Sequence, residues 1–181
     1  MPPRGFVQSF ENNLDKSRKS LVGRQRKPYS HRLSAHAKNI ASALEVISES
    51  SDDYMPPPDS DIDTVQFHRE EAVALQQLQK MISKEFKLEF KNLMPAEDWQ
   101  SEQSELWKKI LIAIFAEINR VEDAIVALRA ALSAPHHMLQ YSEMARLRRN
   151  AFAALGDLGK RWSQVSGTLM ALPAIDQKKS A

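Results

Sequence analysis

Alternating aspartates follow a run of three prolines and form the one metal-like spacing in the sequence. Asp59, Asp61 and Asp63 lie at alternate positions, and Glu70 comes eleven residues after Asp59. Oxygen ligands at positions 1, 3, 5 and 12 are typical of a calcium-binding loop between two helices. That loop needs glycine at position 6, where this chain has Thr64, and the prolines prevent an entering helix. The segment therefore predicts a solvated acidic linker and no metal site.

The histidines give no catalytic or metal-binding pattern. His68 and Glu71 stand three residues apart, in the reverse order of the Glu-x-x-His pairs that bind metals in helical bundles, so we expect a surface pair. The other histidines lack a carboxylate at helical spacing. No Gly-x-Ser-x-Gly, glycine-rich phosphate loop or dinucleotide fingerprint is present. The sequence therefore predicts a protein that is not an enzyme and needs no cofactor.

Positive charge is concentrated in one segment near the N-terminus. Between Lys16 and Lys38 there are eight Lys and Arg residues and no acid, with Tyr29 interleaved. Such cations neutralise phosphates, and an aromatic ring can stack on an unpaired base. An acidic protein partner, or neutralisation by the acidic segment that follows, explains the same charges equally well. The candidate contact residues for nucleic acid or an acidic partner are Lys16, Arg18, Lys19, Arg24, Arg26, Lys27, Arg32 and Lys38.

Charge and proline content divide the chain into four parts. Residues 1–44 carry nine basic and two acidic side chains, a net charge of +7, whereas residues 45–71 carry one basic and nine acidic, a net charge of −8. The three prolines within this acidic segment prevent a helix from crossing it. We predict a basic helical arm (1–48), an acidic proline-rich linker (49–63), a helical bundle (64–172) and a frayed tail (173–181).

Composition limits the fold class and the compartment. The chain has 181 residues, of which 43 % are hydrophobic, with only 5 glycines and no cysteine. Few glycines disfavour a many-turned β-fold, and the lack of cysteine excludes disulfides and thiolate metal sites. The longest apolar run, residues 110–116, is far short of the ~20 residues of a membrane span. We expect an all-α protein without a membrane span, cytoplasmic or, in a eukaryote, nuclear.

One long helix, from Trp107 to Leu132, gives the strongest periodic pattern. Its apolar residues are spaced alternately by four and three, which is typical of a helix packed lengthwise on other helices. Additional apolar residues, namely Ile110, Phe115, Ala124 and Ala131, make the stripe wider than a two-stranded seam. We therefore expect this helix to be the centre of an antiparallel bundle. Its predicted packing residues are Trp107, Leu111, Ile114, Ile118, Val121, Ile125 and Leu128.

Four more helices are expected, at residues 6–21, 31–48, 64–93 and 138–170. The second carries a narrow apolar stripe, which includes Leu33, Ile40 and Leu44 and favours docking on another helix. Trp162 lies on the apolar side of the last. The glycines of that last helix weaken it or permit a close helix contact.

These features predict a non-enzymatic helical assembly or adaptor subunit. It would form a homo-oligomer or dock in a larger complex through its N-terminal arm and the faces of its bundle. The alternative is a nucleic-acid-binding accessory protein for DNA packaging, transfer or replication, which would use the basic residues 16–38.

Overall fold

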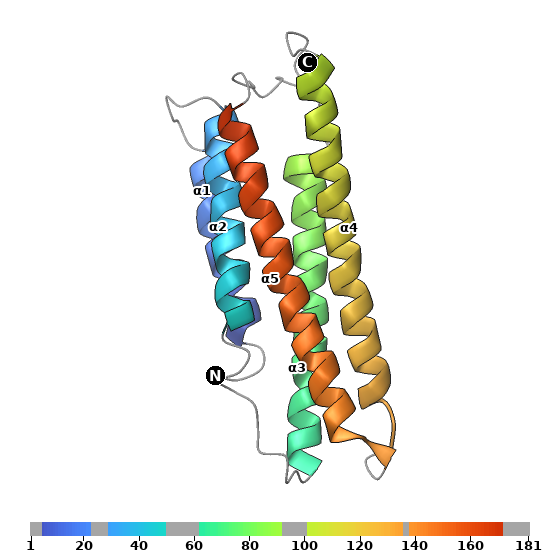
Figure 1. Ribbon diagram of the computed structural model, residues 1–181. Helices are drawn as coiled ribbons and strands as arrows, with labels where there is room; N and C mark the ends of the chain where they lie inside the picture. Colours follow the sequence, from blue (N-terminus) through green and yellow to red (C-terminus); the bar gives the residue numbers. More distant parts are fainter. Residues whose placement is uncertain (1–4, 23–28, 50–61, 92–100, 136–137, 172–181) are drawn as a thin grey trace.

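The chain is an all-helical bundle. The computed structural model describes residues 5–22, 29–49, 62–91, 101–135 and 138–171, and within these ranges it contains no strand (Figure 1). The predicted all-α fold is confirmed. The helices are α1 (Gly5–Val22), α2 (Tyr29–Glu49), α3 (Ile62–Glu85), α4 (Ser101–Leu132) and α5 (Tyr141–Ala171), and a π-helical segment, η2 (Phe86–Lys91), continues α3.

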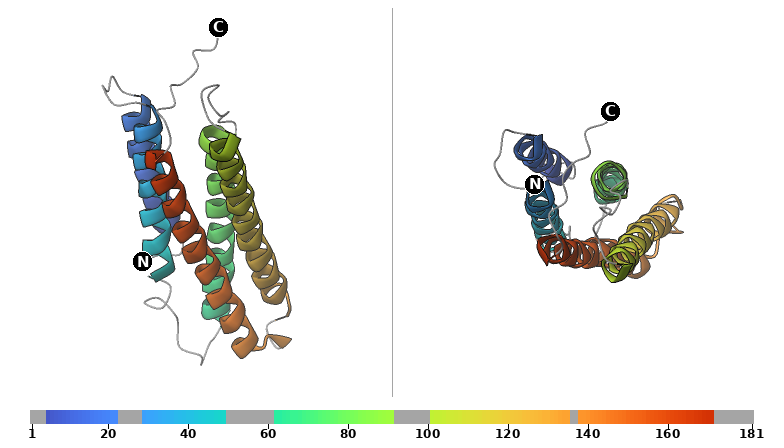
Figure 2. Two further views of the ribbon diagram at one scale, coloured as in Figure 1. Left: turned by 45° about the horizontal axis from the view of Figure 1, so that its top comes forward. Right: turned by 90° about the horizontal axis from the view of Figure 1, so that it is seen from above.

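The order of the helices in space differs from their order in the chain. Viewed from above, they follow one another as α1, α2, α5, α4 and α3 (Figure 2). Each helix runs antiparallel to the next in this series (Figure 1). Contacts between α1 and α3, which run in the same direction, close the series into a ring. The apolar sides of all five helices share one core inside this ring.

Helix α5 lies between α2 and α4, and its interface with α2 is the most extensive in the molecule. The narrow stripe of α2 enters this interface, because Leu33, Ile40 and Leu44 are all buried. Gly159 faces α2 without a side chain, which lets the two helices approach closely. The prediction that this stripe docks on another helix is confirmed.

Helix α4 uses the predicted seam to contact both α3 and α5. Its predicted packing residues are buried, apart from the half-buried Leu111. The buried members are Trp107, Ile114, Ile118, Val121, Ile125 and Leu128.

Helix α3 and η2 together span residues 62–91, where the third helix is predicted over 64–93, and residues 92 and 93 lie outside the described residues. The change to π-helical hydrogen bonding at Phe86 was not foreseen, since apolar spacing alone does not distinguish the two helix types. The rings of Phe86 and Phe90 are both nearly perpendicular to that of the buried Trp162 of α5, with centroids 6.2 and 5.5 Å from it respectively. Such edge-to-face contacts stabilise aromatic pairs beyond the area they bury. η2 thus joins the end of α3 to α5.

The predicted arm packs in the same core as the rest of the molecule. Phe10 and Leu14 of α1, like the stripe of α2, belong to the single hydrophobic cluster that also includes α3, α4 and α5. Nearly all of the predicted linker, residues 50–61, lies outside the described residues, as does the predicted frayed tail. None of the helices in the described part is apolar over a stretch long enough to cross a membrane.

Candidate functional site

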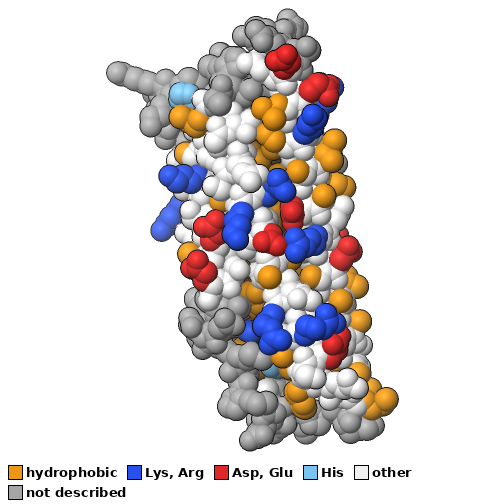
Figure 3. All heavy atoms as spheres, in the orientation of Figure 1, with side chains coloured by type: hydrophobic (Ala, Val, Ile, Leu, Met, Phe, Trp, Pro, Cys, Tyr) orange, Lys and Arg blue, Asp and Glu red, His pale blue; other side chains and the backbone are white. Residues whose placement is uncertain are grey.

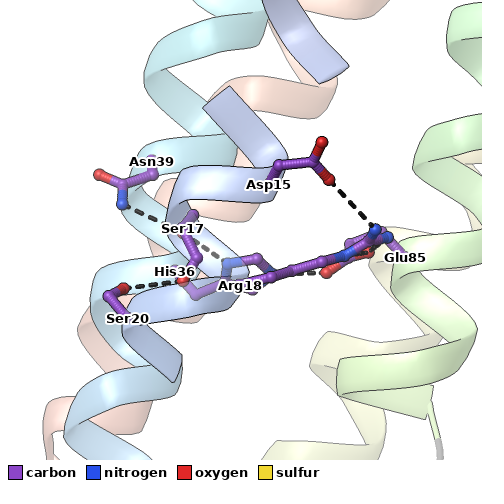
Figure 4. A network of polar contacts seen from close by, with 7 residues as sticks. All are labelled: Asp15, Ser17, Arg18, Ser20, His36, Asn39 and Glu85. Atoms are coloured by element: carbon purple, nitrogen blue, oxygen red, sulfur yellow. Dashed lines mark hydrogen bonds and ion pairs between the residues drawn. The ribbon is translucent and has the colours of Figure 1, made fainter. Parts of the chain in front are cut away.

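A buried polar cluster connects α1, α2 and the C-terminal end of α3 (Figure 4). His36 Nε2 lies 2.6 Å from Glu85 Oε1, and His36 Nδ1 lies 2.6 Å from Ser17 Oγ. Arg18 donates from Nε to Glu85 Oε2 over 2.9 Å and contacts the same oxygen through a second nitrogen. Asn39 donates to Ser17 Oγ over 3.1 Å. Three helices are therefore held together by one carboxylate and its hydrogen-bonded neighbours.

The order serine, histidine, carboxylate in this cluster is that of a hydrolase triad, but the described surroundings of Ser17 lack what nucleophilic catalysis requires. Such catalysis requires donors aimed at a developing oxyanion, usually backbone N–H groups. Ser17 lies in the middle of α1, where backbone N–H groups are used in the helix itself. Glu85 is neutralised by Arg18, and Ser17 is 4 % exposed. The geometry supports a structural role for this cluster.

The same contacts set the charge of Glu85. Burial acts to raise the pKa of Glu85, but the hydrogen bonds from His36 and Arg18 outweigh burial and hold that pKa below its ordinary value. The carboxylate is therefore charged inside the bundle. It closes the ring at the contact between α1 and α3.

A second buried ion pair joins α3 to α5, and it corrects the expectation for His68 and Glu71. Both residues are buried, at 3 % and 4 % exposure, and do not form a surface pair. Arg148 donates to Glu71 through Nε (2.6 Å) and through Nη2 (3.1 Å). The guanidinium of Arg148 neutralises Glu71 in the core, and it lies on α5, 77 residues away in the sequence. Spacing within α3 could not indicate this partner.

His68 lies beside this ion pair. Its Nδ1 is buried and has no hydrogen-bond partner among the described residues. Burial lowers the pKa of His68, and the positive charge of Arg148 lowers it further, to about 4. The imidazole is therefore neutral near pH 7.

The structure separates the eight predicted contact residues of the basic arm into three groups. Arg18 is bound to Glu85, and Arg32 donates a hydrogen bond to the Leu21 carbonyl oxygen, so both serve the fold. Three lysines are exposed, namely Lys16, Lys19 and Lys38. The remaining three, Arg24, Arg26 and Lys27, lie outside the described residues.

The outward face of α4 carries four large apolar side chains among its charged residues. Ile112 is 69 % exposed and Val126 is 55 % exposed, and Leu106 and Phe115 are exposed as well. Figure 3 shows hydrophobic side chains along the edge of the molecule that α4 forms. Isolated exposed apolar residues are ordinary, but Ile112 and Val126 lie on the same line of α4, fourteen residues apart, and Phe115 lies beside that line. This face is our candidate functional site.

A basic groove borders this face between α3 and α4. It has a volume of about 460 Å³, and Leu88 of η2 and Val126 of α4 lie in its lining. Lys80 and Lys84 of α3 and Lys87 of η2 line one side of the groove, and Glu122 of α4 also lies in its lining. The groove adds positive charge to the edge of the apolar face.

Neither groups of metal-ligating residues nor similarity to known proteins indicates another site. Within the described ranges, no three His, Asp or Glu residues are grouped so that they could hold a metal ion. No protein-family model, curated protein or solved structure matches this chain. The functional assignment therefore depends on the surface of the bundle.

Proposed function

We propose that this protein is a non-enzymatic helical assembly subunit that associates through the outward face of α4. The supporting observation is that α4 carries large apolar side chains on two sides. One side is buried against α3 and α5, and the other leaves Ile112, Phe115 and Val126 exposed.

Burial of these side chains would favour association. Removing a large aliphatic or aromatic side chain from water contributes about 1.5–3 kcal/mol. Ile112 and Val126 lie on the same line of α4, about four turns apart, so one second helix could cover both, as in helical bundles. Phe115 also contacts Phe86, with ring centroids 6.5 Å apart, which restricts its movement before any partner binds. A side chain that is already held in place loses less entropy on binding.

The test compares two single variants that differ only in location. Ile112→Asp places a charge on the face of α4, whereas Val46→Asp places the same charge on α2 at nearly the same exposure, 65 % against 69 %. Light scattering should give a mass above the 20.5 kDa of one chain for the wild type and for Val46→Asp, and a monomer for Ile112→Asp. A monomeric wild type at all concentrations, or dissociation by Val46→Asp alone, would refute the proposal.

The nucleic-acid alternative remains a second proposal, supported by the exposed Lys16, Lys19 and Lys38 on α1 and α2. Phosphate contacts release counterions, so binding through these lysines should weaken steeply as salt increases. Gel shifts at two salt concentrations, with the three lysines changed to Gln in the variant, test this. Binding that is absent, or that does not respond to salt, argues against it.

A further inference from the structure

Four charged residues on the outward face of α4, two lysines and two acids, are arranged symmetrically about its middle, and the first of these lysines also contacts Glu105 of its own helix. Lys108 precedes Phe115 by seven residues, and Glu122 follows Phe115 by seven. All three are exposed. Because seven residues make about two helical turns, these side chains form one row along the same flank of the helix.

A second row with the same property runs beside the first. Lys109, Ala116 and Asp123 are again spaced by seven residues, and all three are exposed. Each row therefore reads basic, apolar, acidic from its N-terminal to its C-terminal end. The midpoint of both rows lies at Phe115 and Ala116.

We infer that the partner of this face is α4 of a second copy, bound antiparallel about a two-fold axis beside Phe115 and Ala116. This inference rests on the proposed function, and it specifies the partner and its direction. A two-fold axis places each row against its own reversed copy, since the same patch faces itself in such a dimer.

The antiparallel direction follows from charge. Reversal brings Lys108 of one copy to Glu122 of the other, and Lys109 to Asp123, with each pair formed twice. The apolar midpoint then lies at the centre of the interface, where contacts stabilise a complex most. Parallel pairing at the same level would place lysine against lysine and acid against acid, which is unfavourable. The row between the two flanks contains the exposed residues Glu105, Ile112, Asn119 and Val126, and the reversed copy would bring Ile112 to Asn119 and Val126 to Glu105.

Crosslinking tests the direction, because the chain contains no cysteine and a single introduced one has no competitor. Ala116→Cys and Ala130→Cys change two exposed alanines of the same helix. In the antiparallel dimer, position 116 lies beside its own copy, whereas the two copies of position 130 are about 40 Å apart. Under mild oxidation, Ala116→Cys should form a covalent dimer and Ala130→Cys should not.

Charge exchange tests the pairing itself. The variant Lys108→Glu/Lys109→Glu should raise the dissociation constant of the dimer by about tenfold or more, and so should Glu122→Lys/Asp123→Lys. Combining all four substitutions should restore wild-type association, because every pair is again attractive. Circular dichroism of each variant controls for folding.

The outcomes separate this inference from the proposed function. Crosslinking at both positions would show parallel pairing and overturn the inference. Crosslinking at neither position, in a protein that still dimerises and that Ile112→Asp dissociates, would also overturn it while the proposed function stands. A wild type that stays monomeric would overturn both.

Discussion

Gly159 of α5 packs directly against the backbone of α2, where a Cβ atom on residue 159 would lie 3.1 Å from the carbonyl oxygen of Ala41. That distance is shorter than ordinary van der Waals contact, and the nearest atom belongs to a helix backbone that cannot rotate away. A Cβ atom on Gly167 of the same helix would meet nothing within 4 Å. The close packing of α2 on α5 therefore favours glycine at position 159, whereas no neighbouring atom favours glycine at position 167.

Alanine substitutions at Gly159 and Gly167 should change the free energy of unfolding by different amounts or in opposite directions. Gly167→Ala should stabilise the protein by up to about 1 kcal/mol, since alanine has the higher helix propensity. Gly159→Ala should not give this stabilisation, because the new methyl group pushes α2 away from α5. Urea denaturation of both variants checks this. Equal stabilisation by the two substitutions would show that the close approach at Gly159 has no energetic consequence.

Stability should fall in mildly acidic solution because of His68. In the unfolded chain this histidine takes up a proton near its ordinary pKa of 6.5, whereas in the folded protein the pKa is about 4. As the pH falls below 6.5, the unfolded state therefore binds more protons, and the folded state loses up to about 3 kcal/mol by pH 4.

The variant His68→Leu isolates this effect. Urea denaturation across the same pH range should show a much smaller loss between pH 6.5 and about 5, above the range in which carboxylates titrate. If the variant and the wild type lose stability in parallel, another group is responsible.

Removal of the Glu85 charge should destabilise the bundle strongly. Glu85→Gln leaves Arg18 and His36 without the carboxylate that both contact, and we expect a loss of about 2–3 kcal/mol because Arg18 is partly exposed and recovers some hydration. Glu143→Gln, which alters an exposed ion pair with Arg146, is the matched control and should have little effect. Thermal denaturation near pH 7 compares the two, and similar midpoints would exclude a structural role for the cluster.

The ion pair of Glu71 and Arg148 should show strong coupling. Arg148→Met leaves a buried carboxylate without its cation and should cost about 3 kcal/mol or more. The double variant Glu71→Leu/Arg148→Met removes both charges and should recover most of that loss, because apolar side chains of similar size can replace a buried ion pair. A double variant whose losses simply add would show that the two residues act independently.

Local apolar spacing was sufficient to predict the helices and most of their buried faces. The seam that contains Ile114, Ile118 and Val121 is buried as expected, because a repeat near 3.5 residues places these side chains on one side of α4. The stripe of α2 was predicted for the same reason. Each of these predictions depends only on residues within one helix.

The polar interior could not be predicted in this way, because its partners come from different helices. His36 lies 49 residues from Glu85, and Glu71 lies 77 residues from Arg148. Sequence spacing indicates contacts within one helix, so it assigned His68 and Glu71 to the surface and Arg18 to a binding site. Phe115 was taken to widen the packing stripe, whereas the structure exposes it. The seven-residue spacing of Phe115 from Lys108 and Glu122 was the sequence feature that indicated a second face on α4.

The interface between α2 and α5 has a consequence for synthesis of the chain. Helix α2 ends at Glu49, and α5 begins at Tyr141, so about 90 residues must be added before the main partner of α2 exists. At roughly 5–20 residues per second, the ribosome needs on the order of 5–20 s to make them. Throughout that time the apolar stripe of α2 lacks the surface that finally buries it. The nascent chain is therefore most exposed to aggregation, and most dependent on chaperones, before α5 emerges.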